Sequence, residues 1–484
     1  MKIDAELVKP DNKAQLAQFF TPPEIARFMV ELFEKGDNPN CRLLDPGAGE
    51  GALSEAFLER WVSRDLGFET VALDAFEIDD LLCSSLAQKL SKYNSCAGYS
   101  VKLHNSDFIY AASDSLCRGL IVAKYTHIIL NPPYKKIRSD SEYRRALRRA
   151  RIETVNLYAA FVALSLALLD ERGQLVAIIP RSFCNGPYYR PFRNYLLEHA
   201  SIRHMHLFDS RSKAFKDDGV LQENLIILLE RNGSQDPVTI STSTDATFAD
   251  FTVHKYPFEE IVLPGDPERF IHVPMAPDQS PIGSSSVLQY SLADLGIMVS
   301  TGPVVDFRVK EHLRDMPDAN TAPLLYPTHF NDQGVSWPKE GGKKANAIVV
   351  NEETKKWLYP SGYYCVVRRF SSKEEKRRLV ASVVEPQAFT NTSLLGFENH
   401  LNVLHQGKCG LPELLAHGLA LFLNTTIADN YFRRFNGHTQ VNATDLRLMK
   451  YPSRATLMEL GRWAKQHEGL PQTTIDAKFD TMIL

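Results

Sequence analysis

Up to about residue 232, short apolar runs alternate with segments whose apolar side chains recur at helical spacing. Apolar runs of about four to eight residues that end at turn residues are typical of buried strands. Helical spacing is clearest at 25–33, 53–61 and 157–164. Strands that alternate with helices predict an α/β domain, Rossmann-like, with a mixed, mostly parallel sheet. The predicted strands lie at 42–45, 71–79, 101–108, 126–130, 175–180, 206–209 and 222–229.

The pattern changes beyond residue 232. A Ser- and Thr-rich stretch at 239–247 is typical of edge strands or a linker, and residues 274–286 are rich in Pro, Gly and Ser. We place the domain boundary in the second of these segments, which gives a first domain at 1–274 and a second at 285–484. Strand-like alternation of aromatic and polar residues indicates that the second domain has an α+β fold.

Length and composition agree with two globular domains, because 484 residues exceed what one core usually holds. Seven cysteines without close pairs favour a reducing cytosol and offer no metal framework. The chain starts without the apolar core of a signal peptide, and no apolar run approaches membrane-spanning length. We therefore expect a soluble, cytoplasmic protein without a metal. The net charge of −3 leaves room for a nucleic-acid partner, because basic residues are clustered.

Four successive predicted strands end in residues suited to ligand binding. Open α/β sheets bind ligands at the carboxyl edge of their strands. A Gly-rich turn at 45–51 follows the first strand, Glu77 ends the second, Asp107 and Phe108 end the third, and Asn131 follows the fourth. Taken singly, each of these features also fits an ordinary turn or an exposed strand end. Together they predict one binding site.

The chemistry of these residues suits a nucleoside joined to an amino-acid-like group. The Gly-rich turn has neither dinucleotide spacing nor the Lys-Ser/Thr of a phosphate loop, but Asp45 can pair with an ammonium group. Glu77 is an acceptor-only carboxylate that can bind two ribose hydroxyls. Asp107 can accept from an adenine amino group while Phe108 packs on the purine. Thr21 precedes the first helix, either as its N-cap or as a ligand contact.

The fourth strand ends in Asn131-Pro132-Pro133-Tyr134. The two prolines fix two φ angles and remove two N–H donors, so the turn offers acceptors: the Asn131 side-chain oxygen and the proline carbonyls. Two acceptors that hold both hydrogens of an exocyclic amine free its lone pair for nucleophilic attack. Tyr134 offers a flat face for the ring that carries the amine. Asn-Pro-Pro turns also occur in ordinary loops, but at this position the turn predicts an amino-methyltransferase.

Basic residues follow this turn and recur in the second domain. Such a run is usually a solvated helix face, but beside a catalytic turn it indicates contact with phosphates. Phe215 lies in a polar loop, either as a second stacking surface for an extruded base or as a core contact. We expect DNA contacts from Lys135, Lys136, Arg138, Arg308, Arg368, Arg369, Arg433, Arg434 and His438, those in the second domain at loop tips.

These motifs, in this order, resemble the γ class of DNA adenine-N6 methyltransferases of bacterial restriction–modification systems. The resemblance rests on Phe20-Thr21-Pro22-Pro23, the turn at 45–51, Phe76-Glu77-Ile78-Asp79, Asp107-Phe108 and Asn131-Pro132-Pro133-Tyr134. It implies S-adenosylmethionine as the cofactor, flipped adenine in double-stranded DNA as the substrate, and a C-terminal target-recognition domain. A separate restriction endonuclease is a plausible partner, and we expect a monomer. The residues implied to hold the cofactor are Thr21, Asp45, Pro46, Gly47, Ala48, Gly49, Gly51, Glu77, Ile78, Asp107 and Phe108.

By the same resemblance, the target adenine is held by Asn131, Pro132, Pro133, Tyr134 and Phe215. Three alternatives stay open. Protein-glutamine methyltransferases use a similar turn, but they are short and need no long basic and aromatic extension. A non-catalytic DNA-binding subunit is disfavoured because every motif is chemically intact. Methylation of a cytosine amino group uses the same geometry, and Asn at the first position of the turn favours adenine by resemblance alone.

Overall fold

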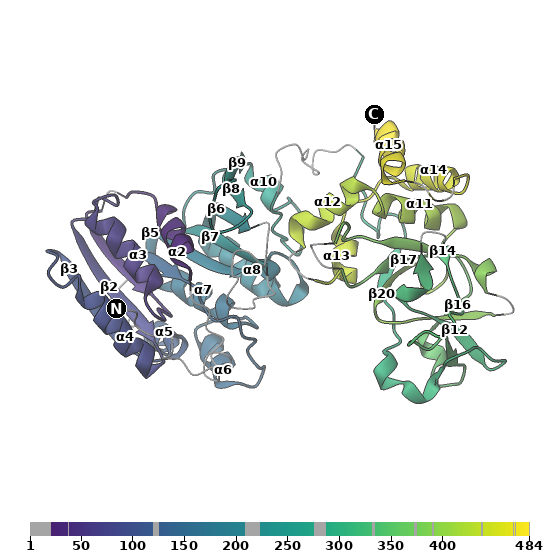
Figure 1. The fold of residues 1–484 in the computed structure, drawn as a ribbon, viewed down its shortest axis with the longest axis horizontal. Helices are drawn as coiled ribbons and strands as arrows, with labels where there is room; N and C mark the ends of the chain where they lie inside the picture. Colours follow the sequence, from purple (N-terminus) through teal and green to yellow (C-terminus); the bar gives the residue numbers. More distant parts are fainter. Residues whose placement is uncertain are drawn as a thin grey trace. The chain divides into compact units, whose positions relative to one another are not determined.

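The computed structural model describes residues 21–36, 38–119, 125–208, 223–274, 287–331, 334–371, 375–389, 392–436, 439–467, 469 and 471–483. They belong to two compact units, Met1–Pro277 and Asp278–Leu484 (Figure 1). The division between the units falls inside the segment at 274–286 that is rich in Pro, Gly and Ser.

The described part of the first unit contains a nine-stranded sheet of order β3-β2-β1-β4-β5-β7-β6-β8-β9. Strands β3 to β5 in this order are parallel, β7 is antiparallel to β5 and β6, and β8 is parallel to β6 and antiparallel to β9. The sheet is therefore the mixed, mostly parallel, Rossmann-like sheet that the sequence predicts. Its strands are β1 (Asn40–Asp45), β2 (Thr70–Glu77), β3 (Tyr99–Asn105), β4 (Tyr125–Leu130), β5 (Leu169–Pro180), β6 (Ala200–Phe208), β7 (Asn224–Arg231), β8 (Val238–Ser243) and β9 (Thr252–Tyr256).

Helices cover both faces of this sheet. Side chains alternate along a strand, so Ile129 of β4 faces one apolar core while Ile128 and Leu130 face the other. The core around Ile129 is closed by α2 (Pro23–Glu31), α3 (Ala52–Val62) and α4 (Asp80–Ser91). The opposite core is closed by α5 (Phe108–Cys117), α6 (Glu142–Arg149), α7 (Leu157–Leu168), α8 (Arg190–His199) and the short α10 (Phe258–Ile261).

Several strand boundaries could not be read fully from the sequence; β6, for example, starts at Ala200 and not at residue 206 as predicted. Strand β5 starts at Leu169, directly after α7, and not at residue 175 as predicted. Its first residues, Asp170 to Arg172, are partly or fully exposed and polar, so they interrupt the apolar run that marks a buried strand. The Ser- and Thr-rich stretch after residue 238, for which an edge strand or a linker was expected, contains β8. This strand pairs with β6 on one side and with β9 on the other, so the expectation of an edge strand was wrong, and β9 forms the edge.

The second unit is α+β, as predicted. Its described residues contain sheets of order β10-β20-β17-β18, β11-β15-β12-β19-β16 and β13-β14, followed by helices near the C-terminus. The strands are β10 (Met298–Thr301), β11 (Leu313–Arg314), β12 (Thr321–Leu325), β13 (Phe330–Asn331), β14 (Gly334–Val335), β15 (Ala347–Val349), β16 (Leu358–Pro360), β17 (Tyr364–Arg368), β18 (Ala381–Val384), β19 (Leu394–Phe397) and β20 (Leu401–His405). The helices are α11 (Glu413–Leu423), α12 (Thr426–Phe435), α13 (Ala443–Leu448), α14 (Arg454–Ala464) and α15 (Gln472–Ile483). None of the described helices is both long enough and apolar enough to cross a lipid bilayer.

Candidate functional site

A cavity opens at the carboxyl edge of the parallel strands in the first unit. Its empty volume is about 1090 Å³, part of which is open to solvent. Thr21, Glu77, Asp107 and Asn131 line it together with the Gly-rich turn. The parallel direction of β1 to β4 brings these strand ends to one edge. The strand tips that the sequence assigned to one ligand therefore lie around a single cavity.

The turn between β1 and α3 lies across the tip of β2. The Ala48 N–H donates to the Phe76 carbonyl at 2.9 Å, and the Gly49 N–H donates to Oε2 of Glu77 at 2.9 Å. Gly49 and Gly51 have φ of 53° and 80°, in the left-handed region that favours glycine. Glycine at these positions allows the turn to fold back onto β2. The backbone of residues 46–50 therefore forms a wall of the cavity next to the Glu77 carboxylate.

Glu77 presents an oriented carboxylate to the cavity. Its Oε1 accepts from the Asp79 N–H at 2.8 Å, and its side chain is buried, with 5% of the residue exposed. Burial raises the pKa of Glu77, while the backbone N–H groups of Asp79 and Gly49 oppose that rise. A carboxylate oxygen can accept more than one hydrogen bond. Glu77 can therefore also accept from a pair of ligand hydroxyls, as predicted for a ribose.

Asp107 and Phe108 line the end of the cavity at the tip of β3. Asp107 caps α5, because its Oδ1 accepts from the Tyr110 N–H at 3.1 Å. Phe108 packs against Phe161 with 5.2 Å between ring centroids, and both rings line the cavity. This end combines an acceptor carboxylate with aromatic surface, which is what a purine base requires.

Tyr143 completes this end of the cavity and was not predicted from the sequence. Its hydroxyl donates to Oδ2 of Asp107 at 2.5 Å, and its ring stacks on Tyr110 with 5.1 Å between centroids. It belongs to α6, inside the run of basic residues that the sequence assigned to DNA contact. A single tyrosine between arginines gives no signal in the sequence, because only the packing of α6 on α5 brings it to the cavity.

Asn131 lies in the same cavity, and its amide is held at both ends. Its Nδ2 donates to Oγ1 of Thr21 at 3.1 Å, and its Oδ1 accepts from the Tyr134 hydroxyl at 3.0 Å. Thr21 thus contacts the turn at 131–134. The N-cap position of α2 is Pro22, without a side-chain cap, so the reading of Thr21 as the N-cap was wrong. The amide oxygen has a second lone pair with which to accept a further hydrogen bond. The side chain is therefore oriented before any substrate arrives.

Tyr134 differs from the open stacking face that the sequence suggested. The residue is 9% exposed, its ring lies edge-on to Tyr158 at 6.3 Å, and its hydroxyl lies 3.3 Å from the Ile178 carbonyl. Burial raises the pKa of Tyr134 far above its ordinary value, so the hydroxyl remains a donor. The ring packs into the apolar core beneath the turn. In this conformation Tyr134 orients Asn131, and a stacked base would require its ring to move.

Asp45 also differs from expectation. The residue is fully buried behind the turn, and its Oδ2 accepts from the Ser54 hydroxyl at 2.7 Å. Its Oδ1 has no hydrogen-bond partner among the described residues, and burial raises the pKa of Asp45 to about 7. Asp45 does not line the cavity in the described structure. In this conformation the carboxylate joins the end of β1 to α3 and does not face the cavity, so the pairing of Asp45 with a ligand ammonium stays a prediction.

The other predicted cofactor and turn residues divide in the same way. Gly51 and Pro132 lie outside the lining of the cavity, as far as the structure describes it. The remaining predicted residues that line it are Pro46, Gly47, Ala48, Gly49, Ile78, Phe108 and Pro133. Phe215 and His438 lie outside the described residues.

Three predicted DNA contacts of the first unit, Lys135, Lys136 and Arg138, are exposed next to the turn at 131–134. The outward side of α6 adds the exposed Arg145, Arg148 and Arg149. Arg144 points inward and is ion-paired with Glu153. Arg138, Arg145, Arg148 and Arg149 are also ion-paired, with Asp140, Glu142, Glu153 and Asp114 in that order. The surface beside the cavity therefore carries many basic side chains, most of which lie next to a carboxylate.

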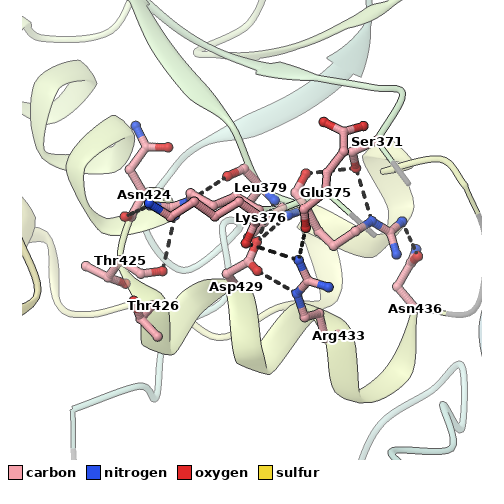
Figure 2. Close-up of polar contacts among 12 residues, drawn as sticks. Ser371, Glu375, Lys376, Leu379, Asn424, Thr425, Thr426, Asp429, Arg433 and Asn436 are labelled. Atoms are coloured by element: carbon pink, nitrogen blue, oxygen red, sulfur yellow. Dashed lines mark hydrogen bonds and ion pairs between the residues drawn. The ribbon is translucent and has the colours of Figure 1, made fainter. Parts of the chain in front are cut away.

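Most of the basic candidates in the second unit are tied to other parts of the protein. Arg433 and Arg434 were expected at a loop tip, but they lie in α12, and Arg434 is only 4% exposed. Figure 2 shows Arg433 between Asp429, 2.7 Å from its Nε, and the Glu375 carbonyl, 2.9 Å from its Nη2. These two arginines therefore stabilise the second unit.

Arg368 is ion-paired with Glu375, and Arg369 donates to the Asn399 carbonyl and to Oε1 of Gln440, both at 3.2 Å. Arg308 is exposed, and its guanidinium lies 5.5 Å from the centroid of the Phe307 ring. Arg308 is thus the predicted residue of this unit that the described structure leaves most open to a partner.

Comparison with known proteins identifies relatives along the whole chain. Residues 77–215 match the Eco57I restriction-modification methylase family. The chain is 51% identical to the type II methyltransferase M.BsuBI of Bacillus subtilis, over 98% of this chain and 95% of that protein. It is 40% identical to the type II methyltransferase M.PstI of Providencia stuartii, over 96% of this chain and 92% of that protein. Its fold is similar to that in a cryo-electron microscopy structure of a DrdV–DNA complex, with a TM-score of 0.50 and 12% identity over 94% of this chain and 57% of that one.

Proposed function

The chain belongs to the type II methyltransferases of restriction–modification systems, and from that premise we propose that it methylates the N6 amino group of an adenine flipped out of duplex DNA. The observation that carries the proposal is the shared cavity of Asn131 and Glu77. An acceptor amide for the amine and a carboxylate for ribose hydroxyls lie on the wall of one cavity. This arrangement supports transfer from a bound nucleoside cofactor to an exocyclic amine.

S-adenosylmethionine is the cofactor, and when bound it supplies a methyl group on a sulfonium, which is already a good electrophile. The residues of the cavity fit this group. We assign its amino-acid end to Thr21 and the turn at 46–50, its ribose to Glu77, and its adenine to Asp107, Phe108 and Tyr143. Tyr143 takes part because its hydroxyl donates to the second carboxylate oxygen of Asp107 and so orients that carboxylate.

Asn131 is the residue assigned to the target amine. Its Oδ1 accepts one hydrogen of the amine, and the Pro132 carbonyl accepts the other, although Pro132 lies outside the described lining and must be reached by the substrate from the rim of the turn. The hydrogen bonds of Asn131 with Thr21 and Tyr134 hold the amide in place before the substrate binds. The amide therefore needs little reorganisation during the reaction. The amine must lose one proton after methylation, and water can take it. No side-chain base is needed.

Exposed Lys135, Lys136 and Arg138 beside the turn support a contact with DNA phosphates. We propose that the second unit recognises the target sequence. A separate restriction endonuclease that cuts the unmethylated site is the partner this family implies, and cytoplasmic DNA is the expected substrate.

The experiment that tests the function is nucleoside analysis after methyl transfer. Purified protein is incubated with duplex DNA of mixed sequence and isotopically labelled cofactor, and the DNA is then digested to nucleosides. We expect the label in N6-methyladenine. Label in N4-methylcytosine would assign the same amine chemistry to cytosine, and label in protein or in neither nucleoside would refute the proposal.

A further inference from the structure

The turn between β19 and β20 holds an exposed imidazole on a buried carboxylate. Glu398 is fully buried, whereas 42% of the His400 side chain is exposed. Nδ1 of His400 lies 2.6 Å from Oε1 and 2.8 Å from Oε2 of Glu398, and the His400 backbone N–H donates to Oε2 at 2.8 Å. A buried carboxylate is costly unless it is paired. Here its side-chain partner is a histidine that points to the surface.

The backbone of this turn is fixed to neighbouring segments. The Asn399 N–H donates to the Val304 carbonyl at 2.9 Å, and the Arg369 N–H donates to the His400 carbonyl at 2.8 Å. A Cβ on Gly302 would lie 2.2 Å from the Glu398 carbonyl oxygen, so only glycine permits this close approach. The imidazole is therefore presented by a rigid backbone, which is the condition for reading a fixed pattern of hydrogen-bonding groups.

An exposed aromatic ring lies beside the imidazole. The Phe370 ring is 4.8 Å from the His400 ring, and 41% of Phe370 is exposed. The Arg369 guanidinium lies 5.8 Å from the centroid of the Phe370 ring. The turn thus combines a polar ring nitrogen and an apolar ring on one exposed surface.

The carboxylate also determines what the free nitrogen can do. Because Nδ1 donates to Glu398, Nε2 is the nitrogen left for an outside partner, and no hydrogen bond to it occurs among the described residues. A phosphate is a poor partner here, because the adjacent Glu398 carboxylate repels an anion. A base edge is a good one, since it offers directional donors and acceptors beside methyl and ring carbons that Phe370 can contact.

We propose that His400 is a specificity-determining residue that contacts a base edge of the recognition sequence through Nε2, with Glu398 as its positioning residue and Phe370 as the adjoining apolar contact. The proposal rests on the proposed methylation of duplex DNA by this chain. It adds to that function a specific point of sequence readout in the second unit.

The test compares sequence preference before and after substitution of His400. Methylated positions in a library of DNA fragments define the recognition sequence of the wild-type protein, and kcat/KM is then measured on that sequence and on its single-base variants. For His400→Ala we expect loss of discrimination at one base pair of the site. One good base contact corresponds to a discrimination of roughly 5- to 150-fold. Glu398→Gln should weaken discrimination at the same base pair, and less severely, because its amide oxygen can still accept from Nδ1.

His467→Ala is the matched control, since His467 is also exposed and stacks on an aromatic ring, Trp463, at 4.7 Å, but has no ion pair with a carboxylate in the described structure. It should leave the sequence preference unchanged. Equal loss on all sequences with a shallower dependence on salt would make His400 a phosphate contact and overturn the proposal. Unchanged discrimination, or a loss that follows a lowered thermal midpoint in both His400→Ala and His400→Gln, would overturn it as well. If the wild-type protein transfers no methyl group to DNA, the proposed function itself has failed.

Discussion

The hydrogen bond from Tyr134 to Asn131 should increase the rate of methyl transfer. Substitution Tyr134→Phe keeps the buried ring and removes the hydroxyl that donates to Oδ1 of Asn131 at 3.0 Å and lies 3.3 Å from the Ile178 carbonyl. One such hydrogen bond contributes about 0.5–1.5 kcal/mol. Without it the Asn131 amide keeps its bond to Thr21 through Nδ2, but Oδ1 loses the hydroxyl donor that helps to fix its orientation.

If that contribution is expressed fully in the transition state, the rate falls by about 2- to 13-fold, since each 1.36 kcal/mol is a factor of ten. The assay is single-turnover methyl transfer to DNA with the cofactor saturating. Cofactor affinity should stay unchanged, because Tyr134 does not line the described cavity.

Tyr158→Phe is the matched control. Tyr158 is buried edge-on to Tyr134, but its hydroxyl bonds to Ser182 at 3.3 Å and not to Asn131. It should lose stability without a specific loss of rate. A Tyr134→Phe protein that transfers methyl groups at the wild-type rate would refute the idea that this hydroxyl orients the amide. An equal loss of rate in both variants would show that the effect of Tyr134→Phe comes from general packing and not from the hydrogen bond to Asn131.

Three further predictions concern the cavity and the residues behind it. Tyr143→Phe should weaken cofactor binding by about 2- to 13-fold in calorimetry, because Asp107 loses a hydrogen bond. Tyr110→Phe is the control, since it keeps the stacked ring and Tyr110 donates to Asp107 through its backbone. Equal effects of the two substitutions would contradict the role of the Tyr143 hydroxyl. Glu77→Gln should also weaken cofactor binding, because the amide presents one acceptor oxygen where the carboxylate presents two, and unchanged affinity would contradict the ribose assignment. Burial raises the pKa of Asp45 to about 7, so the contribution of Asp45 to stability falls as pH rises from about 4 to 7, where the folded protein holds this proton more tightly than the unfolded chain does. Asp45→Asn should remove this dependence. Between pH 4 and pH 8, the free energy of unfolding of the variant, measured in urea, should improve relative to that of the wild type by up to about 4 kcal/mol. A constant difference between the two proteins across this pH range would contradict the prediction.

The site was largely predictable because its chemistry sits at strand ends. A parallel sheet brings its carboxyl ends to one edge, so Glu77, Asp107 and Asn131 could be assigned to one cavity from their order alone. Directions of side chains could not be assigned in this way. Asp45 follows the same rule of position, yet it turns inward to Ser54.

Residues whose role depends on packing between helices and strands could not be predicted from the sequence. Tyr143 reaches the cavity only because α6 packs on α5. In the second unit, clusters of arginine indicated a basic surface, but Arg434 is buried and Arg433 pairs with Asp429. A charged residue in a sequence shows neither whether it is exposed nor whether an acid from another segment neutralises it.

Asn131→Ala shows whether the Asn131 amide holds the target amine during transfer. The measurement is the single-turnover rate at which N6-methyladenine forms in duplex DNA with the cofactor saturating. We predict a rate about 100- to 1,000-fold below wild type, the usual consequence of removing one preorganised hydrogen-bonding group from a transition state. A rate within about tenfold of wild type, less than about 1.4 kcal/mol in the barrier, would contradict the account.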